Sequence, residues 1–189
     1  MARILIPLAN GSEELEAVTL IDLLRRAGFD VVTAGLEPGP VRCSRGTMLL
    51  PDQTLDEAEG GDYDLMVLPG GLPGADHLNA DPRIHRLLKK LSEQGRFVGA
   101  ICAAPKVLAD AGLLKGRKAT SFPGVLEGME LGDDTTLTAE TVQRDGNVIT
   151  SRGPGTAMDF ALALIELLAG PEKRREVEEP LQRPGGRQA

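Results

Sequence analysis

The sequence predicts an α/β sandwich in which helices cover both faces of a mostly parallel sheet. Short apolar runs alternate along the chain with longer segments whose apolar residues recur at helical spacing. The runs are apolar at successive positions, which is typical of strands buried on both faces. Hydrophobic residues make up 41% of the 189 residues and charged ones 26%, a balance typical of a globular protein. We expect one domain over residues 1–182 and a disordered tail over 183–189.

Each element follows from a local pattern. The apolar run 4–8 predicts the first strand, and the turn Asn10-Gly-Ser12 ends it. We expect Ser12 to cap a helix whose first turn carries Glu13 and Glu14 and which stops at Gly28. The same reasoning predicts strands at 31–34, 64–68 and 97–101, helices at 82–93, 104–111 and 156–168, a short β excursion at 41–50, and a hairpin within 138–151 that turns at Asp145-Gly146.

Composition excludes several classes of protein. The net charge of −7 argues against stable nucleic-acid binding, which needs an excess of Lys and Arg. Acidic residues follow the first apolar run within a few positions, so we expect neither a signal peptide nor a membrane helix there. Two cysteines do not make a disulfide framework or a metal-ligand cluster. A cytoplasmic location with free thiols is the expectation.

Three unusual features fall at the carboxyl ends of the predicted strands, where parallel sheets bind ligands. They are the turn at residues 10–12, the pair Gly70-Gly71 and Cys102. Two glycines at a strand end form a tight turn and also permit close backbone approach to a ligand. We therefore expect a binding site at this edge of the sheet.

Glu16 is a carboxylate on the apolar face of the first helix, between the directions of Leu23 and Ala27. Such a group must be paired, hydrogen-bonded or protonated. One interpretation is a structural glutamate held by the backbone or by an arginine. The other is an active-site carboxyl whose pKa is raised and which shares a proton with a neighbour.

Cys102 lies in "VGAICAAP", where a strand turns directly into a helix. A free cysteine often only fills space in a core. Here small neighbours leave room beside the thiol, and we expect the amides that start the following helix to lower its pKa. The arrangement resembles a nucleophile elbow, with the amides of Ala103 and Gly71 forming an oxyanion hole. We expect Cys102 to be functional.

Other chemically interesting residues receive no role from the sequence. Cys43 is expected to pack or to form an interface contact, and His77 and His85 to be solvated or locally hydrogen-bonded. No set of residues has convincing metal-ligand spacing, and no nucleotide-binding loop or GxSxG motif is present. We predict no metal and no cofactor.

The sequence resembles the ThiJ/PfpI superfamily, in the branch that contains the human parkinsonism-associated deglycase and bacterial YajL. The resemblance covers about residues 4–180. It is carried by several motifs in order: "GSEELEAV", "VRCSRG", "VLPGG", "GAICAAP" and "TSRGPGTAMDFAL".

The resemblance implies a flavodoxin-like fold, a homodimer and roles for particular residues. Cys102 matches the reactive cysteine of the family, and Glu16 matches a protonated glutamate that donates a hydrogen bond to it. Gly71 and Ala103 match the positions that supply oxyanion-hole amides, beside Gly70. Arg45 matches an arginine near the pocket of the opposite subunit. Cys43 matches a cysteine of the dimer interface.

The activity that the resemblance implies is that of a cysteine-dependent deglycase or glutathione-independent glyoxalase. Its substrates would be methylglyoxal, glyoxal or their adducts on proteins and nucleotides, in defence against carbonyl and oxidative stress. One alternative is a redox sensor and chaperone whose Cys102 is oxidised to a sulfinate. A weaker one is a protease or amidotransferase. Phe122-Pro123 stands where some members have histidine and proline, which argues against a Cys-His dyad.

Overall fold

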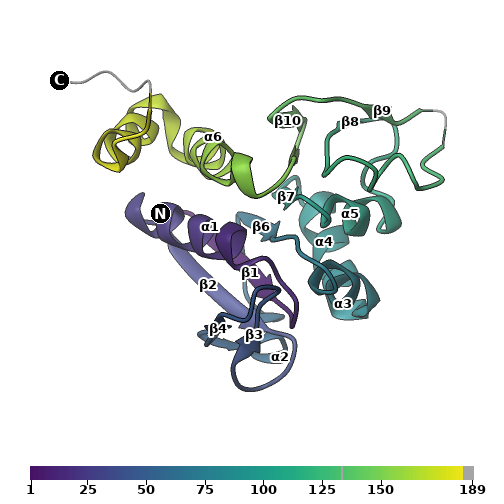
Figure 1. The fold of residues 1–189 in the computed structure, drawn as a ribbon, viewed down its shortest axis with the longest axis horizontal. Helices are drawn as coiled ribbons and strands as arrows, with labels where there is room; N and C mark the ends of the chain where they lie inside the picture. Colours follow the sequence, from purple (N-terminus) through teal and green to yellow (C-terminus); the bar gives the residue numbers. More distant parts are fainter. Residues whose placement is uncertain (133, 185–189) are drawn as a thin grey trace.

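The computed structural model describes residues 1–132 and 134–184 and is built around a seven-stranded sheet (Figure 1). Its strands are β1 (Arg3–Leu8), β2 (Asp30–Gly35), β5 (Gln53–Thr54), β6 (Leu65–Leu68), β7 (Phe97–Ile101), β10 (Val142–Asp145) and β11 (Val148–Ser151). Their order across the sheet is β10-β11-β7-β6-β1-β2-β5. Only the β10–β11 pair is antiparallel, and the other neighbours run parallel. The predicted mostly parallel sheet is confirmed.

Helices cover both faces of this sheet (Figure 1). One face carries α1 (Glu14–Arg26) and α6 (Ala157–Glu178), which pack against each other. The other face carries α2 (Leu55–Ala58), α3 (Gly74–Ala80), α4 (Pro82–Glu93) and α5 (Pro105–Asp110). The predicted α/β sandwich is therefore present.

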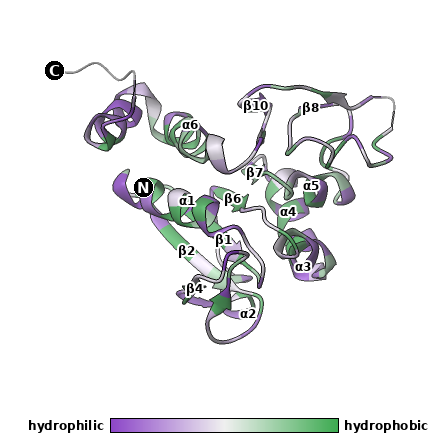
Figure 2. Ribbon diagram, viewed as in Figure 1, coloured by the Kyte–Doolittle hydropathy of each residue, from purple (hydrophilic) through white to green (hydrophobic). Residues whose placement is uncertain are grey.

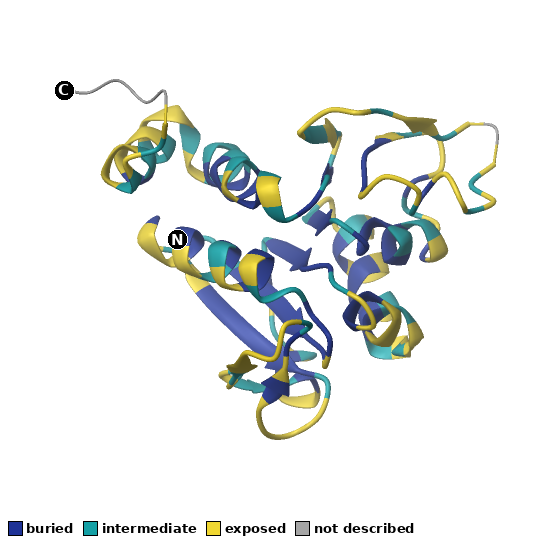
Figure 3. Ribbon diagram, viewed as in Figure 1, coloured by how far each residue is buried: buried dark blue, intermediate teal, exposed yellow. Residues whose placement is uncertain are grey.

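Side chains alternate between two hydrophobic cores, one on each face of the sheet. On β1, Ile4 and Ile6 pack with α1 and α6, whereas Leu5 packs with the helices of the opposite face. Figure 3 shows the resulting pattern, with the central strands buried and the outward sides of the helices exposed. This burial on both faces explains why the strands read as continuous apolar runs.

Two short strand pairs and two short 3-10 helices complete the fold. The predicted β excursion is the hairpin β3 (Val41–Arg42) with β4 (Met48–Leu49), and β8 (Lys118–Ala119) pairs with β9 (Thr136–Leu137). The 3-10 helices are η1 (Pro154–Thr156) and η2 (Glu179–Leu181). The β10–β11 hairpin turns at Gly146 and Asn147, one residue later than predicted, because Asp145 still pairs with Val148.

The structure corrects the predicted start of the first helix. Glu13, not Ser12, is the N-cap, and its carboxylate accepts from the amide of Leu15. Ser12 is fully buried, and its hydroxyl accepts a 3.1 Å hydrogen bond from the amide of Ala9. The serine therefore closes the turn that follows β1 instead of capping α1.

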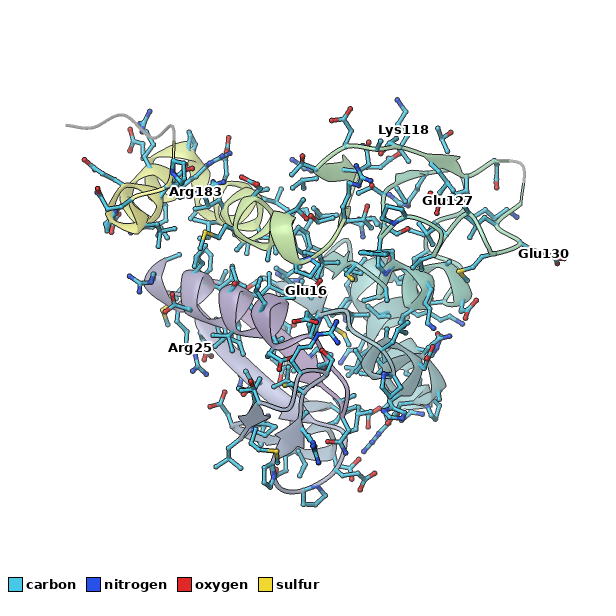
Figure 4. The ribbon with its side chains drawn as sticks, viewed as in Figure 1. Glu16, Arg25, Lys118, Glu127, Glu130 and Arg183 are labelled. Atoms are coloured by element: carbon cyan, nitrogen blue, oxygen red, sulfur yellow. The ribbon has the colours of Figure 1, made fainter. Side chains whose placement is uncertain are left out.

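The helix predicted at 156–168 begins at Ala157, and the charged segment from Glu172, where the sequence also predicts a helix, continues it as α6 after a break. Gly170, at φ 88°, interrupts α6 just before Pro171, and a second helical piece follows. Figure 2 shows this final piece as mostly hydrophilic, in keeping with its charged sequence. Arg183, which we expected to begin a loose tail, forms ion pairs with Asp159 and Glu178 (Figure 4). The rest of the predicted tail, residues 185–189, lies outside the described residues.

Candidate active site

Cys102 occupies the elbow between β7 and α5. Its φ of 64° lies in the left-handed region, which costs a residue other than glycine on the order of 1–3 kcal/mol. Two backbone hydrogen bonds hold it there. Its amide donates to the carbonyl of Ser151 (3.1 Å), and its carbonyl accepts from the amide of Phe122 (2.8 Å). The predicted sharp strand-to-helix turn is therefore present, and its thiol is partly exposed.

Glu16 is fully buried on the inner side of α1, as its place on the apolar arc predicts. Figure 4 shows it on the side of α1 that faces the interior, whereas Arg25 points to the surface. Its Oε2 accepts a 2.7 Å hydrogen bond from the amide of Gly70. Its Oε1 is buried without a hydrogen-bond partner among the described residues, and the carboxyl lies beside the thiol of Cys102. The backbone contact fits a structural glutamate, but the unpartnered oxygen beside a thiol fits a protonated, proton-sharing one.

Gly70 and Gly71 allow the turn after β6 to lie directly against Cys102 and α1. A Cβ on Gly70 would lie 2.6 Å from the Cβ of Cys102 and 2.8 Å from Oε2 of Glu16. Gly71 has a φ of 89°, and a Cβ there would meet the amide nitrogen of Glu13 at 2.4 Å. Only glycine fits at these two positions without displacing the backbone.

The pKa of Glu16 is raised from its ordinary 4.5 to about 7. Burial is the largest cause, and the nearby charge of Glu13 adds to it. Hydrogen bonds from Gly70 and Cys102 work in the opposite direction because they stabilise the carboxylate. Close to neutral pH this carboxyl can therefore both hold and release a proton, as a general acid and base must.

The structure corrects our expectation for the pKa of Cys102. Burial, followed by the charge and hydrogen bonding of Glu16, raises the pKa of the thiol to about 12. The amides of Gly71 and Ala103 hydrogen-bond to the sulfur and lower the pKa, but they do not outweigh burial next to a carboxylate. The predicted helix contributes little, since α5 begins only at Pro105 and has six residues. A proton on Glu16 removes its contribution, so thiolate formation depends on the protonation of that carboxyl.

Five of the six site residues predicted from the sequence come together: Glu16, Gly70, Gly71, Cys102 and Ala103. Arg45, the sixth, lies on the turn of the β3–β4 hairpin. Within the described chain no hydrogen bond or ion pair joins its side chain to Glu16 or Cys102. The position near the opposite subunit's pocket stays a prediction.

Glu14 holds the Arg45 turn against the start of α1. Its carboxylate accepts from the amides of Arg45 and Thr47 and from the hydroxyl of Ser44. Burial alone would raise the pKa of Glu14, but these hydrogen bonds, with one from its own amide, lower it to about 2. Glu14 is therefore ionised and structural, unlike Glu16.

The remaining cysteine and the two histidines lie outside this cluster. Cys43 is buried, and burial together with the charges of Glu14 and Glu13 raises its pKa to about 11. His77 contacts the carbonyl of Asn10 at 2.8 Å, and His85 contacts that of Asn79 at 2.7 Å. The prediction that each histidine is solvated or locally hydrogen-bonded is confirmed, since His77 is exposed and His85 bonds to a residue six positions away.

Two further observations concern the described part of the chain. There, no three His, Cys, Asp or Glu side chains come close enough together to hold a metal ion. None of its helices is both long and apolar enough to span a membrane.

One feature beside the elbow has no clear signal in the sequence. Leu72 and Phe122 are large apolar side chains that are 60% and 48% exposed. Both stand in loops, where no periodic pattern marks them. Each is adjacent to a residue of the cluster, because Leu72 follows Gly71 and the amide of Phe122 donates to Cys102. The thiol therefore has apolar neighbours open to solvent.

This chain is similar to known proteins in sequence and in fold. The DJ-1/PfpI family model matches residues 2–167. The Parkinson disease protein 7 homolog of Danio rerio is 44% identical over 181 residues, which are 95% of this chain and 96% of that protein. The glutathione-independent glyoxalase DJR-1.2 of Caenorhabditis elegans is 39% identical, with 95% of each chain covered. The crystal structure of Drosophila melanogaster DJ-1beta superposes with a TM-score of 0.90 at 43% identity, covering 95% of this chain and 97% of that one. The predicted superfamily resemblance is thus confirmed, and the chain belongs to the DJ-1/PfpI family, in its DJ-1 branch.

Proposed function

We propose that this chain is a cofactor-independent glyoxalase or deglycase that uses Cys102 as its nucleophile. The observation that carries the proposal is the buried carboxyl of Glu16, with a pKa of about 7, beside a thiol on a strained elbow. Two backbone amides, from Gly71 and Ala103, point at the same sulfur. A nucleophile, a proton carrier and two fixed donors are the parts that carbonyl chemistry requires.

The first step forms a bond between the sulfur and the aldehyde carbon of methylglyoxal. The thiol proton passes to solvent as the sulfur attacks, and the π electrons of the carbonyl move to its oxygen. The amides of Gly71 and Ala103 stabilise the developing oxyanion, and a proton from Glu16 completes a hemithioacetal. Glu16 is then a carboxylate and ready to act as a base.

The second step moves a hydrogen within the bound intermediate. The carboxylate of Glu16 takes the proton from the former aldehyde carbon, which gives an enediol, and a proton returned to the neighbouring carbon leaves a thioester. Water cleaves the thioester, releasing lactate and the free thiol. The aldehyde carbon is oxidised and the ketone carbon is reduced, so no external oxidant is needed. Glyoxal would give glycolate by the same route.

With adducts of dicarbonyls on amines or thiols, the sulfur replaces the amine or thiol at the same carbon, and the thiol proton leaves with that group. The hemithioacetal that results then enters the second step. The relative named a glutathione-independent glyoxalase supports this class of chemistry. The exposed apolar neighbours Leu72 and Phe122 are compatible with substrates larger than methylglyoxal.

The test is a steady-state assay of lactate formation from methylglyoxal in metal-stripped, thiol-free buffer. Wild type and Cys43→Ser should turn over, whereas Cys102→Ser should not. Cys43→Ser is the matched control because Cys43 is the second cysteine of the chain and stands outside the cluster. Equal rates for wild type and Cys102→Ser would rule out the proposed mechanism.

A second candidate function is oxidation sensing at Cys102. Oxidation of the thiol to a sulfinate adds two acceptor oxygens. Oε1 of Glu16 has no hydrogen-bond partner among the described residues, and a protonated Glu16 would donate from it to one of them. Peroxide treatment followed by intact-mass analysis distinguishes the two functions. A sensor gains two oxygen atoms at Cys102 in wild type but only one in Glu16→Leu, whose side chain has no hydrogen-bond donor, whether or not turnover is observed.

A further inference from the structure

A groove of about 350 Å³ opens beside the candidate oxyanion amides. Its walls come from loop residues, from α3 and from α5. The residues that line it are Leu72, Asn79, Ala103, Lys106, Asp110, Val125 and Met129. None of its polar side chains takes part in the chemistry proposed above.

The groove begins where the attacked carbonyl would lie. Ala103 is one of its walls and follows Cys102 in the chain, and Leu72 follows Gly71. The Gly70-Gly71 turn is in contact with Cys102, so Leu72 stands only one residue beyond the candidate oxyanion hole. A carbonyl oxygen that accepts from the amides of Gly71 and Ala103 would therefore lie next to two walls of the groove, Ala103 itself and Leu72.

The lining combines large apolar side chains with a lysine that is already paired. Leu72, Val125 and Met129 supply large apolar side chains. Lys106 forms an ion pair with Asp76, and the side-chain amide of Asn79 donates to Asp110 at 2.6 Å. Oδ1 of Asn79 has no partner among the described residues, which adds an acceptor but no charge. An anionic substituent would meet no free cation in this lining, whereas an apolar one would displace water from apolar walls.

We propose that this groove binds the apolar substituent of the carbonyl compound that Cys102 attacks. The chain accordingly prefers 2-oxoaldehydes with a large alkyl or aryl group over methylglyoxal, and methylglyoxal over glyoxal. This inference rests on the proposed function for its substrate class. The groove itself can be tested through the thiol alone, without turnover.

The test compares two alkylating reagents with the same reactive group, iodoacetamide and N-phenyliodoacetamide. In both, the sulfur displaces iodide and the thiol proton goes to solvent, so only the phenyl group differs. The rate of Cys102 labelling is measured by intact mass in a Cys43→Ser background. We expect Cys102 of the protein with the intact groove to react faster with N-phenyliodoacetamide than with iodoacetamide. Leu72→Ala and Met129→Ala should each lower the ratio of the two rates about tenfold, the effect of one apolar group in a hydrophobic pocket.

Two further variants serve as controls for this comparison. Leu72→Met keeps an apolar side chain of similar size and should restore the wild-type ratio. Leu137→Ala removes a leucine of β9 outside the groove and should leave the ratio unchanged. A ratio that stays at its wild-type value in both Leu72→Ala and Met129→Ala overturns the inference.

Turnover separates this inference from the proposed function. If the labelling ratio falls in the groove variants but no variant or wild type converts phenylglyoxal or methylglyoxal, the groove stands and the proposed activity fails. If wild type converts methylglyoxal and phenylglyoxal, but the labelling ratio and the ratio of kcat/KM values are insensitive to Leu72 and Met129, the activity stands and the groove fails.

Discussion

Glu16 accepts a 2.7 Å hydrogen bond from the backbone amide of Gly70, a residue 54 positions away in the sequence. This contact ties the start of α1 to the turn that also supplies the amide of Gly71. The carboxyl therefore cannot move independently of the candidate oxyanion hole. Its other oxygen remains available to the thiol of Cys102.

Replacing Glu16 with glutamine should separate its structural from its chemical role. The side-chain oxygen of glutamine can still accept from Gly70, so the fold should survive. Turnover of methylglyoxal should fall by ~10²–10⁴-fold, as expected for a lost general acid and base. Glu16→Asp should also lose activity, since its shorter side chain does not reach the sulfur.

The thiol titration of the same variant provides an independent measurement. Glu16→Gln should lower the pKa of Cys102 below about 12, because the charge and hydrogen bonding of Glu16 help to raise it. Thiolate absorbance against pH measures this, with Cys102→Ser as the blank. A glutamine variant that unfolds early, yet keeps its specific activity and thiol pKa, would contradict a catalytic role.

Glu16 should also make stability depend on pH. Its folded pKa of about 7 lies above the ordinary 4.5, so the native state binds more protons in this window. Its contribution is fully present below about pH 4.5 and is lost as the pH rises through 7. Glu16→Gln should therefore become more stable relative to wild type between pH 5 and pH 8, by up to roughly 3 kcal/mol. Urea unfolding at several pH values measures the difference.

Glu14→Gln is the control for that experiment, with the opposite sign. The pKa of Glu14 is lowered to about 2, so its stabilisation is present above about pH 4.5 and is lost only as the pH falls through 2. This variant should be destabilised by the same amount at pH 5 and at pH 8. If the difference in unfolding free energy from wild type depended on pH in the same way for both variants, burial would not shift the pKa of Glu16.

Alkylation should distinguish the two cysteines. Cys102 is partly exposed, whereas Cys43 is buried among the charges of Glu13 and Glu14. Limiting iodoacetamide near neutral pH should label Cys102 well ahead of Cys43, as measured by peptide mass. Equal labelling of the two cysteines, or labelling of Cys102 only after unfolding, would indicate that Cys102 only fills space in the core.

Gly70→Ala should inactivate the protein without abolishing its fold. The added methyl group would stand 2.6 Å from the Cβ of Cys102 and must displace the elbow. A misplacement of about 1 Å can lower a rate ~10²-fold. Gly60→Ala is the matched control, because a Cβ there meets nothing within 4 Å. The same activity in both variants would mean that the elbow tolerates the methyl group.

A homodimer remains our prediction for the oligomeric state. Exposed apolar side chains lie on α1, at Leu15 and Val18, and at the end of the β3–β4 hairpin, at Met48 and Leu50. The turn that carries Arg45 connects β3 to β4. Sedimentation should give a dimer at micromolar concentration, and Val18→Asp should weaken it. A wild-type protein that sediments only as a monomer would remove Arg45 from the proposed site.

The sequence by itself determined most of the architecture. Strands buried on both faces must be apolar at successive positions, so β1, β6 and β7 were visible within one or two residues. Helix α4 begins at Pro82 and ends at Glu93 as predicted, because Pro82 and its apolar spacing are local signals. Glu16 and Cys102 stood out for the same reason, since each violates the local pattern around it.

Only the tertiary structure decided how those residues affect one another. The short helices α2 and α3 were missed because too few residues carry a helical period. Ser12 was taken for a cap because its partner, the strand-end amide of Ala9, is revealed only by the folded turn. The direction of the Cys102 pKa was wrong for a related reason. Local sequence shows the amides near a thiol, but burial and the approach of a carboxylate from 86 residues earlier arise only when the sheet and α1 pack together.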